Sequence, residues 1–290
     1  MLRYKRMEKH GCTLAASALT HTGKILRSGA ALITYGILLA FVLFNFIFNL
    51  IENVKVQYVT QMVDPIKVLT TSVYSNPSIF LMLLYPILVV FPTCTLWLSD
   101  KGSGMITFLV SRSGRRNYWF GKLGAVFAAT FIIFTVPFLI ELLLCVLSYD
   151  PSSLGDPSGN PYVYALENDR VFFMYGLWAR NRYLYALLMI VLFGGLSGIL
   201  ACFNFSVTTL PFMRFRILTF FPVYVLLYAG VLIEGVFRTR TILSYFVLFR
   251  MFYSHEGMIR NDLLYFFLMM GLLLISVVIV FFKSREDQLS

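Results

Sequence analysis

The chain has 290 residues, of which 59% are hydrophobic and 13% are charged, with a formal net charge of +10. Soluble domains are closer to half apolar and a quarter charged, so a water-soluble core would not take up this much apolar surface. The composition predicts an all-α polytopic membrane protein. Because the basic residues lie beside apolar stretches and not along an extended basic stripe, it argues against nucleic-acid binding.

Six apolar stretches are each long enough to cross a bilayer as a helix. They are residues 30–51, 78–98, 123–148, 184–205, 217–236 and 263–282. A further apolar piece, residues 241–252, would reach only roughly 18 Å as a helix, which is too short for a crossing. We therefore expect residues 1–290 to form a single transmembrane domain of six spans, with a short re-entrant or interfacial segment between spans five and six.

Most of the 24 Lys and Arg residues lie in the N-terminal tail, in the loops after the second and fourth spans, and in the C-terminal tail. Such residues resist translocation, so these segments are predicted to face the cytoplasm, with both termini inside. If residues 241–252 did cross the membrane, the C-terminus would lie outside.

No catalytic, cofactor or metal motif is found in the sequence. A nucleotide-binding loop needs GxxxxGK[ST], and neither Gly23-Lys24 nor Gly121-Lys122 has the upstream glycine or the following Ser or Thr. The three histidines, His10, His21 and His255, show no metal-ligand spacing. We expect no catalytic residue, no metal site and no cofactor in this chain.

Two carboxylates, Glu141 and Glu234, fall inside predicted spans, where an ionisable residue is a functional candidate because a charge is costly to bury in lipid. Counting along each helix places both near the outer interface. We favour interfacial anchoring, or pairing with Arg238 or Arg240. Lining an external exit path is the alternative.

Small residues recur on one side of the fourth predicted span at Gly194, Gly198 and Cys202. Such a stripe lets a second helix approach closely. We expect that helix to belong to the same chain, and a seam between two subunits is the alternative.

The loop between spans two and three, residues 99–122, is the most informative stretch. Asp100 and Lys101 lead into a short apolar run, Met105–Val110, that predicts about two helical turns. Glycines precede this run, and Ser113-Gly114 ends it before Arg115 and Arg116. A basic membrane anchor would explain the charges, but not an apolar helix that faces water unless something covers it.

This loop resembles that of the type-2 ABC exporter permease family, which has an acidic-basic pair, a glycine, a leucine-rich turn and then a basic turn. The resemblance implies that the loop contains a coupling helix that docks into a separate ATPase subunit. The residues implied in coupling are Asp100, Lys101, Gly104, Met105, Phe108, Leu109, Arg112, Arg115 and Arg116. Met105 stands where Thr is common, and Ser113 where Pro is common.

By this resemblance, the chain would be a permease subunit in a bacterial cytoplasmic membrane, with an N-terminal interfacial helix. Its partners would be two copies of an ATPase, which bind ATP and Mg, and a second permease subunit. The exported cargo would be amphipathic, with peptides or antimicrobials favoured and lipids or drugs still open. A membrane-embedded enzyme and an ion-coupled secondary carrier are the alternative functions.

Overall fold

The computed structural model of the protein describes residues 14–54, 64–66, 69–71, 75, 77–149, 175–211, 213, 215–237 and 262–285. All regular secondary structure in these residues is helical, which confirms the all-α prediction. The helices are α2 (Leu14–Leu26), α3 (Gly29–Asn53), α4 (Ser78–Val90), α5 (Leu96–Gly102), α6 (Met105–Ser113), α7 (Arg115–Ser148), α9 (Tyr175–Arg180), α10 (Arg182–Thr208), η3 (Arg216–Phe220), α11 (Phe221–Phe237) and α13 (Asp262–Arg285).

Five of the described helices are long and apolar enough to cross a membrane: α3, α7, α10, α13, and α11 together with η3. They coincide with five of the six predicted spans. The segment 241–252, for which a re-entrant or interfacial course was predicted, lies outside the described residues.

The second predicted span, residues 78–98, is not one continuous helix. Helix α4 ends at Val90 after 13 residues, turns follow, and α5 begins at Leu96. Pro92 lies in these turns, and a proline ring clashes with the preceding helical turn while supplying no N–H donor. Helix α4 alone is roughly 20 Å long.

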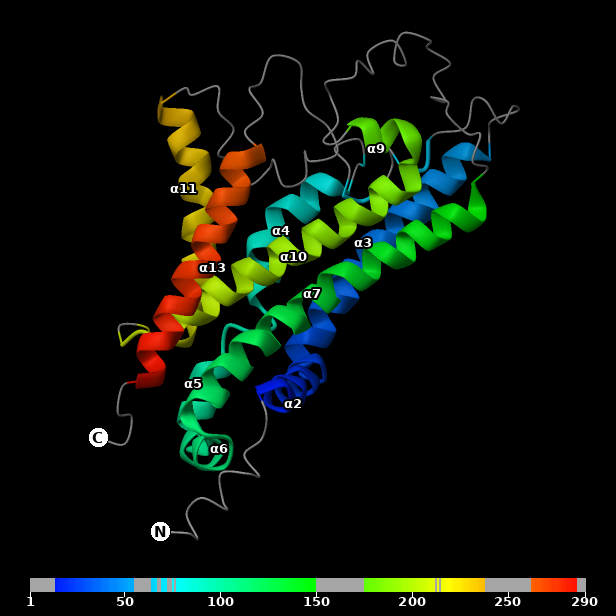
Figure 1. Ribbon diagram of the computed structural model, residues 1–290. Helices are drawn as coiled ribbons and strands as arrows, with labels where there is room; N and C mark the ends of the chain where they lie inside the picture. The colour runs from blue at the N-terminus through cyan, green and yellow to red at the C-terminus, as the bar shows by residue number, and fades with distance from the viewer. Residues whose placement is uncertain are drawn as a thin grey trace, which may run out of the picture.

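The long helices alternate in direction along the bundle (Figure 1). Helices α3 and α7 run from the end where α2, α5 and α6 gather towards the end that carries α9, and α10 and α13 run back. We call these the α6 end and the α9 end. The first described residues, in α2, and the last, at the end of α13, therefore lie towards the α6 end.

Helices α7 and α10 form the centre of the bundle, since about half of each apolar segment is buried, whereas α11 and α13 are buried over 17% and 22%. Small residues allow α7 and α10 to approach closely. A Cβ at Gly194 would lie 2.0 Å from Thr135 Oγ1, and one at Gly198 would lie 2.8 Å from the Phe127 ring. The prediction that the small-residue stripe packs within the chain is confirmed.

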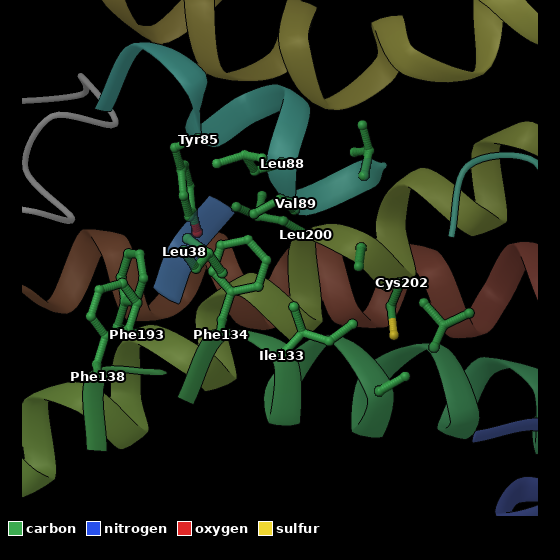
Figure 2. Close-up of a cluster of buried hydrophobic side chains, with 14 of the residues drawn as sticks. Leu38, Tyr85, Leu88, Val89, Ile133, Phe134, Phe138, Phe193, Leu200 and Cys202 are labelled. Atoms are coloured by element: carbon green, nitrogen blue, oxygen red, sulfur yellow. The ribbon is translucent and has the colours of Figure 1, made fainter. Parts of the chain in front are cut away.

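Aromatic rings fill the space between α4, α7 and α10 (Figure 2). Phe193 of α10 lies 5.3 Å from Tyr85 and 5.5 Å from Phe138, measured between ring centroids. The hydroxyl of Tyr85 is within 3.0 Å of Ser197 Oγ, so this buried polar group has a partner. This contact attaches α4 firmly to the centre of the bundle although α4 is short.

Candidate functional site

Helix α6 is a nine-residue helix bounded by two glycines with positive φ. Gly104 precedes it in the left-handed conformation (φ 67°, ψ 3°), and Gly114 follows it with φ 78° and ψ 145°. Residues with a Cβ adopt such angles at a cost, so glycine suits both positions. The short helix predicted at Met105–Val110 is confirmed and extends to Ser113.

One side of α6 packs on the protein and the other does not. Ile106, Leu109 and Val110 are partly buried against the core, but no residue of α6 is fully buried. Met105 and Phe108 are 44% and 64% exposed. Of the predicted coupling residues, Leu109 therefore faces the protein, while Met105 and Phe108 present apolar surface outward.

Basic residues lie within α6 and directly before and after it in the sequence. Lys101, Arg112 and Arg116 are exposed, and Arg115 is half-buried at the start of α7. The exposed surface of α6 therefore combines apolar side chains with positive charge, which suits a partner with an apolar groove and an acidic rim.

Asp100 lies inside the protein and not on this surface. Its side chain forms an ion pair with Lys122 of α7 and accepts a hydrogen bond from the hydroxyl of Tyr118 at 3.0 Å. Lys24 of α2 lies 3.7 Å from its other oxygen. Direct contact between Asp100 and a docked ATPase does not fit this burial, whereas a role in shaping the loop does.

The same network includes Lys122 as a second buried charge. Its ammonium group, besides pairing with Asp100, lies 3.3 Å from the carbonyl oxygen of Leu96 and 3.2 Å from the hydroxyl of Tyr118. Because the donors and acceptors are satisfied on both sides, the pair can be buried without an orphaned charge. The network joins α5 to α7 directly beneath α6.

The ionisation of two groups at this end reflects their surroundings. Burial alone would raise the pKa of Asp100, but the charge of Lys122, the hydrogen bonds from Lys122 and Tyr118, and the charge of Lys24 lower it overall. For His21 of α2, burial and then the charge of Lys122 lower the pKa. The imidazole of His21 lies edge-on to the Tyr118 ring, with centroids 5.8 Å apart.

Two further contacts fix α5 and α2 on α7. The rings of Trp97 and Trp119 are 4.8 Å apart, which packs α5 against α7. A Cβ at Gly121 would lie 2.6 Å from Ser17 Oγ, so glycine is needed for the close approach of α2. The sequence offered one signal for this arrangement: Tyr118 and Lys122 are four residues apart and share a helix face.

At the α9 end, Glu141 is buried, with only 1% of its surface exposed. Its Oε1 accepts hydrogen bonds from Asn45 Nδ2 at 2.8 Å, from the Thr70 backbone N–H at 2.8 Å and from the Thr70 hydroxyl at 2.7 Å. An exposed interfacial anchor does not fit this burial, and the predicted pairing with Arg238 or Arg240 falls on residues outside the described part of the chain. The side chain of Glu234, together with Arg238 and Arg240, lies outside the described part of the chain.

The described residues contain no group of three or more His, Cys, Asp or Glu side chains that could hold a metal ion. Comparison with known proteins gives no further assignment, since no protein-family model, no curated protein and no solved structure matches this chain.

Proposed function

We propose that this chain is the membrane-spanning permease subunit of an ATP-driven ABC exporter, in which α6 docks into a separate ATPase subunit. The observation that carries the proposal is the exposure of α6. This short helix lies at one end of an apolar bundle and turns Met105 and Phe108 away from the protein. Apolar surface of this kind marks an interaction site. Its place in the chain is that of the coupling helix in the resembling permeases.

In this proposal, the α6 end faces the bacterial cytoplasm. Helix α4, the turns after it and α5 together make the second of six crossings, so that both termini are cytoplasmic. Helix α2 lies at the membrane interface, and residues 241–252 are re-entrant. The proposal is supported by the clustering of Lys and Arg in segments that belong to the α6 end.

Two ATPase copies bind ATP and Mg and act on two permease subunits, either identical or different. When the ATPases close on ATP, they favour one conformation of the permease pair, since a ligand shifts an equilibrium only by its differential affinity for the two states. The push on α6 reaches α7 through α5, because the Asp100–Lys122 pair joins these helices. The exported cargo is amphipathic, with a peptide or antimicrobial favoured over a lipid or drug.

The alternative functions differ in what drives them. A membrane-embedded enzyme would act in the purified chain without nucleotide, and an ion-coupled carrier would transport on an ion gradient without ATP. Enzyme activity of the purified chain without nucleotide, or transport by it on an ion gradient without ATP, would contradict the ATPase-coupled proposal.

Affinity purification of the full chain from its native membranes tests docking directly. The wild-type chain should bring down an ATPase, and the recovered complex should hydrolyse ATP. Phe108→Glu should abolish recovery, because it places a charge in the centre of the apolar face, and Arg112→Glu with Arg116→Glu should lower it by removing the positive rim.

Phe215→Glu is a matched control, because Phe215 is 70% exposed and lies outside α6, between α10 and η3. It should leave recovery unchanged. Equal loss with Phe215→Glu, or an intact complex with Phe108→Glu, would overturn the docking role of α6.

A further inference from the structure

Glu141 is buried at the α9 end, and no described residue of opposite charge lies beside it. All three groups that contact Oε1 are neutral: the Asn45 amide, the Thr70 backbone N–H and the Thr70 hydroxyl. The other oxygen, Oε2, is buried and has no hydrogen-bond partner. Within the described residues, Glu141 forms no ion pair.

A second buried carboxylate at the same end shows the usual solution. Asp64 is 2% exposed, forms an ion pair with Arg182 and accepts a hydrogen bond from the Ile66 backbone N–H at 2.9 Å. Asp64 is thus neutralised by an arginine, whereas Glu141 is not. Asp64 has a positively charged partner, and Glu141 has none among the described residues. We therefore infer that the negative charge of Glu141 is balanced by something that Glu141 binds.

Among the described residues, the surroundings of Glu141 are a polar network that contains no cation. Asn45 Oδ1 accepts from the Ser75 hydroxyl at 2.9 Å and from Asn49 Nδ2 at 3.1 Å. These contacts link α3, α7, Thr70 and Ser75 around the carboxyl group. An ionised carboxylate in such a site is removed from bulk water and has no counter-charge among the described residues, and the effective penalty is several kcal/mol.

We propose that Glu141 is a proton-binding site, which holds a proton on Oε2 while this network is closed and releases it when the network opens to water. The Oε2 atom is the place for the proton because Oε1 already accepts three hydrogen bonds. A proton needs a single oxygen. A metal ion needs several oxygen ligands, and two of the three groups on Oε1 are N–H donors, which cannot ligate a metal.

The titratable neighbours do not supply the missing charge. Cys145, one turn further along α7, is buried, and its thiol is not a cation. The Tyr149 hydroxyl accepts from Asn53 of α3 at 3.2 Å, and Arg182 is engaged by Asp64. The described residues of α3 that contact this region, Asn45 and Asn53, are neutral.

Proton release by Glu141 would make the arrangement of α3, α7, Thr70 and Ser75 depend on pH. The inference rests on the α9 end alone, and it stands or falls independently of ATPase docking at α6. It also assigns a role to a carboxylate that no hydrolysis or docking step uses.

The test compares melting temperatures of the full chain and of Glu141→Gln in lipid nanodiscs from about pH 5 to about pH 9. Glutamine has the shape of the protonated acid and cannot ionise. Relative to Glu141→Gln, the wild-type chain should lose stability as pH rises, by up to tenfold in the folded-to-unfolded ratio per pH unit, and the two should converge at low pH. His21 is common to both chains, so its contribution cancels in the comparison. Parallel pH profiles would overturn the proposal.

Asp64→Asn is the matched control. It should destabilise the chain across the whole range, because it breaks the ion pair between Asp64 and Arg182. Replacing Na⁺ and K⁺ by choline should change neither chain, and a stabilisation of the wild type by either metal ion that is absent from Glu141→Gln would overturn the assignment to a proton.

Infrared spectroscopy of the wild-type chain tests the proposal even where Glu141→Gln fails to fold. Exposed carboxyls are ionised at neutral pH, so a carboxylic acid C=O band in folded protein at that pH comes from a buried, protonated group. We expect such a band, with a shift in D₂O, and its absence would overturn the proposal.

Discussion

Asp100 of α5 and Lys122 of α7 form a buried ion pair that fixes the base of α6 on the longest described helix. Lys24 of α2 adds a third helix to the same point at 3.7 Å. The exposed helix α6 is therefore held in place by these ion pairs as well as by apolar packing.

Removing one partner of this pair should destabilise the chain strongly. Asp100→Asn leaves the Lys122 ammonium group buried with no counter-charge, and Lys122→Met does the same to Asp100. Breaking a buried pair in this way costs about 3–5 kcal/mol. Thermal melting in nanodiscs measures the loss. The double change Asp100→Leu with Lys122→Met should recover part of it, and single variants that melt like the wild type would contradict the buried pair.

His21 should make stability depend on mild acidification. Burial and Lys122 lower its pKa, so the folded chain binds fewer protons than the unfolded chain below the ordinary value of about 6.5. Stability should then fall as pH drops from about 7.5 to about 5.5. His21→Phe keeps a ring beside Tyr118 and should lose this part of the pH dependence. An identical slope in both chains would show that folding does not change the protonation of His21.

The two glycines that bound α6 should not tolerate a side chain. Gly104→Ala and Gly114→Ala should each cost about 1–2 kcal/mol, because an alanine at positive φ brings Cβ against its own backbone. Gly102→Ala is a matched control in the same loop, with no atom within 4 Å of the new Cβ and no positive φ. Melting temperature and ATPase recovery should fall together in the first two variants only. A similar loss in Gly102→Ala would point to a general effect on the loop.

At the contact between α7 and α10, the effect of replacing a glycine by alanine should likewise depend on its position. Gly198→Ala brings a Cβ to 2.8 Å from the Phe127 ring and 3.2 Å from its carbonyl oxygen, so the helices must separate. Such overpacking costs typically about 1–3 kcal/mol. Gly195→Ala lies on the same helix with nothing within 4 Å and should be neutral. Melting temperatures of the two variants, measured side by side, decide the point.

Local signals in the sequence were sufficient to predict α6. One turn precedes the apolar run Met105–Val110 and another follows it. Glycines at positive φ then set the ends of the helix. Five of the apolar stretches appear as long helices for the same reason, since their hydrophobicity is continuous. The remaining stretch, residues 78–98, does not form one helix because Pro92 interrupts it, and this proline is visible in the sequence.

The positions of the buried charges were harder to predict, because their partners are distant in sequence. Asp100 looked like a surface residue in a charged loop, since Lys122 was placed outside the following helix. That helix begins at Arg115 and not at residue 123, because nothing after Gly114 breaks it and charged residues lower only the average hydrophobicity. Counting along the helix placed Glu141 near an interface, but it did not reveal that Thr70 folds over the residue from another segment.

Helix α7 has one more mechanical property. Its 34 residues form one helix roughly 50 Å long, with Lys122 near one end and Glu141 near the other. A helix is stiff along its axis, so α7 behaves as a connecting rod between the Asp100–Lys122 pair under α6 and the carboxyl group at the far end. Pro137, one turn before Glu141, has no N–H to donate to the Ile133 carbonyl, so the helix has one backbone hydrogen bond fewer at this turn. Bending there would move Glu141 against Asn45 and Thr70 while the rest of the helix stays straight.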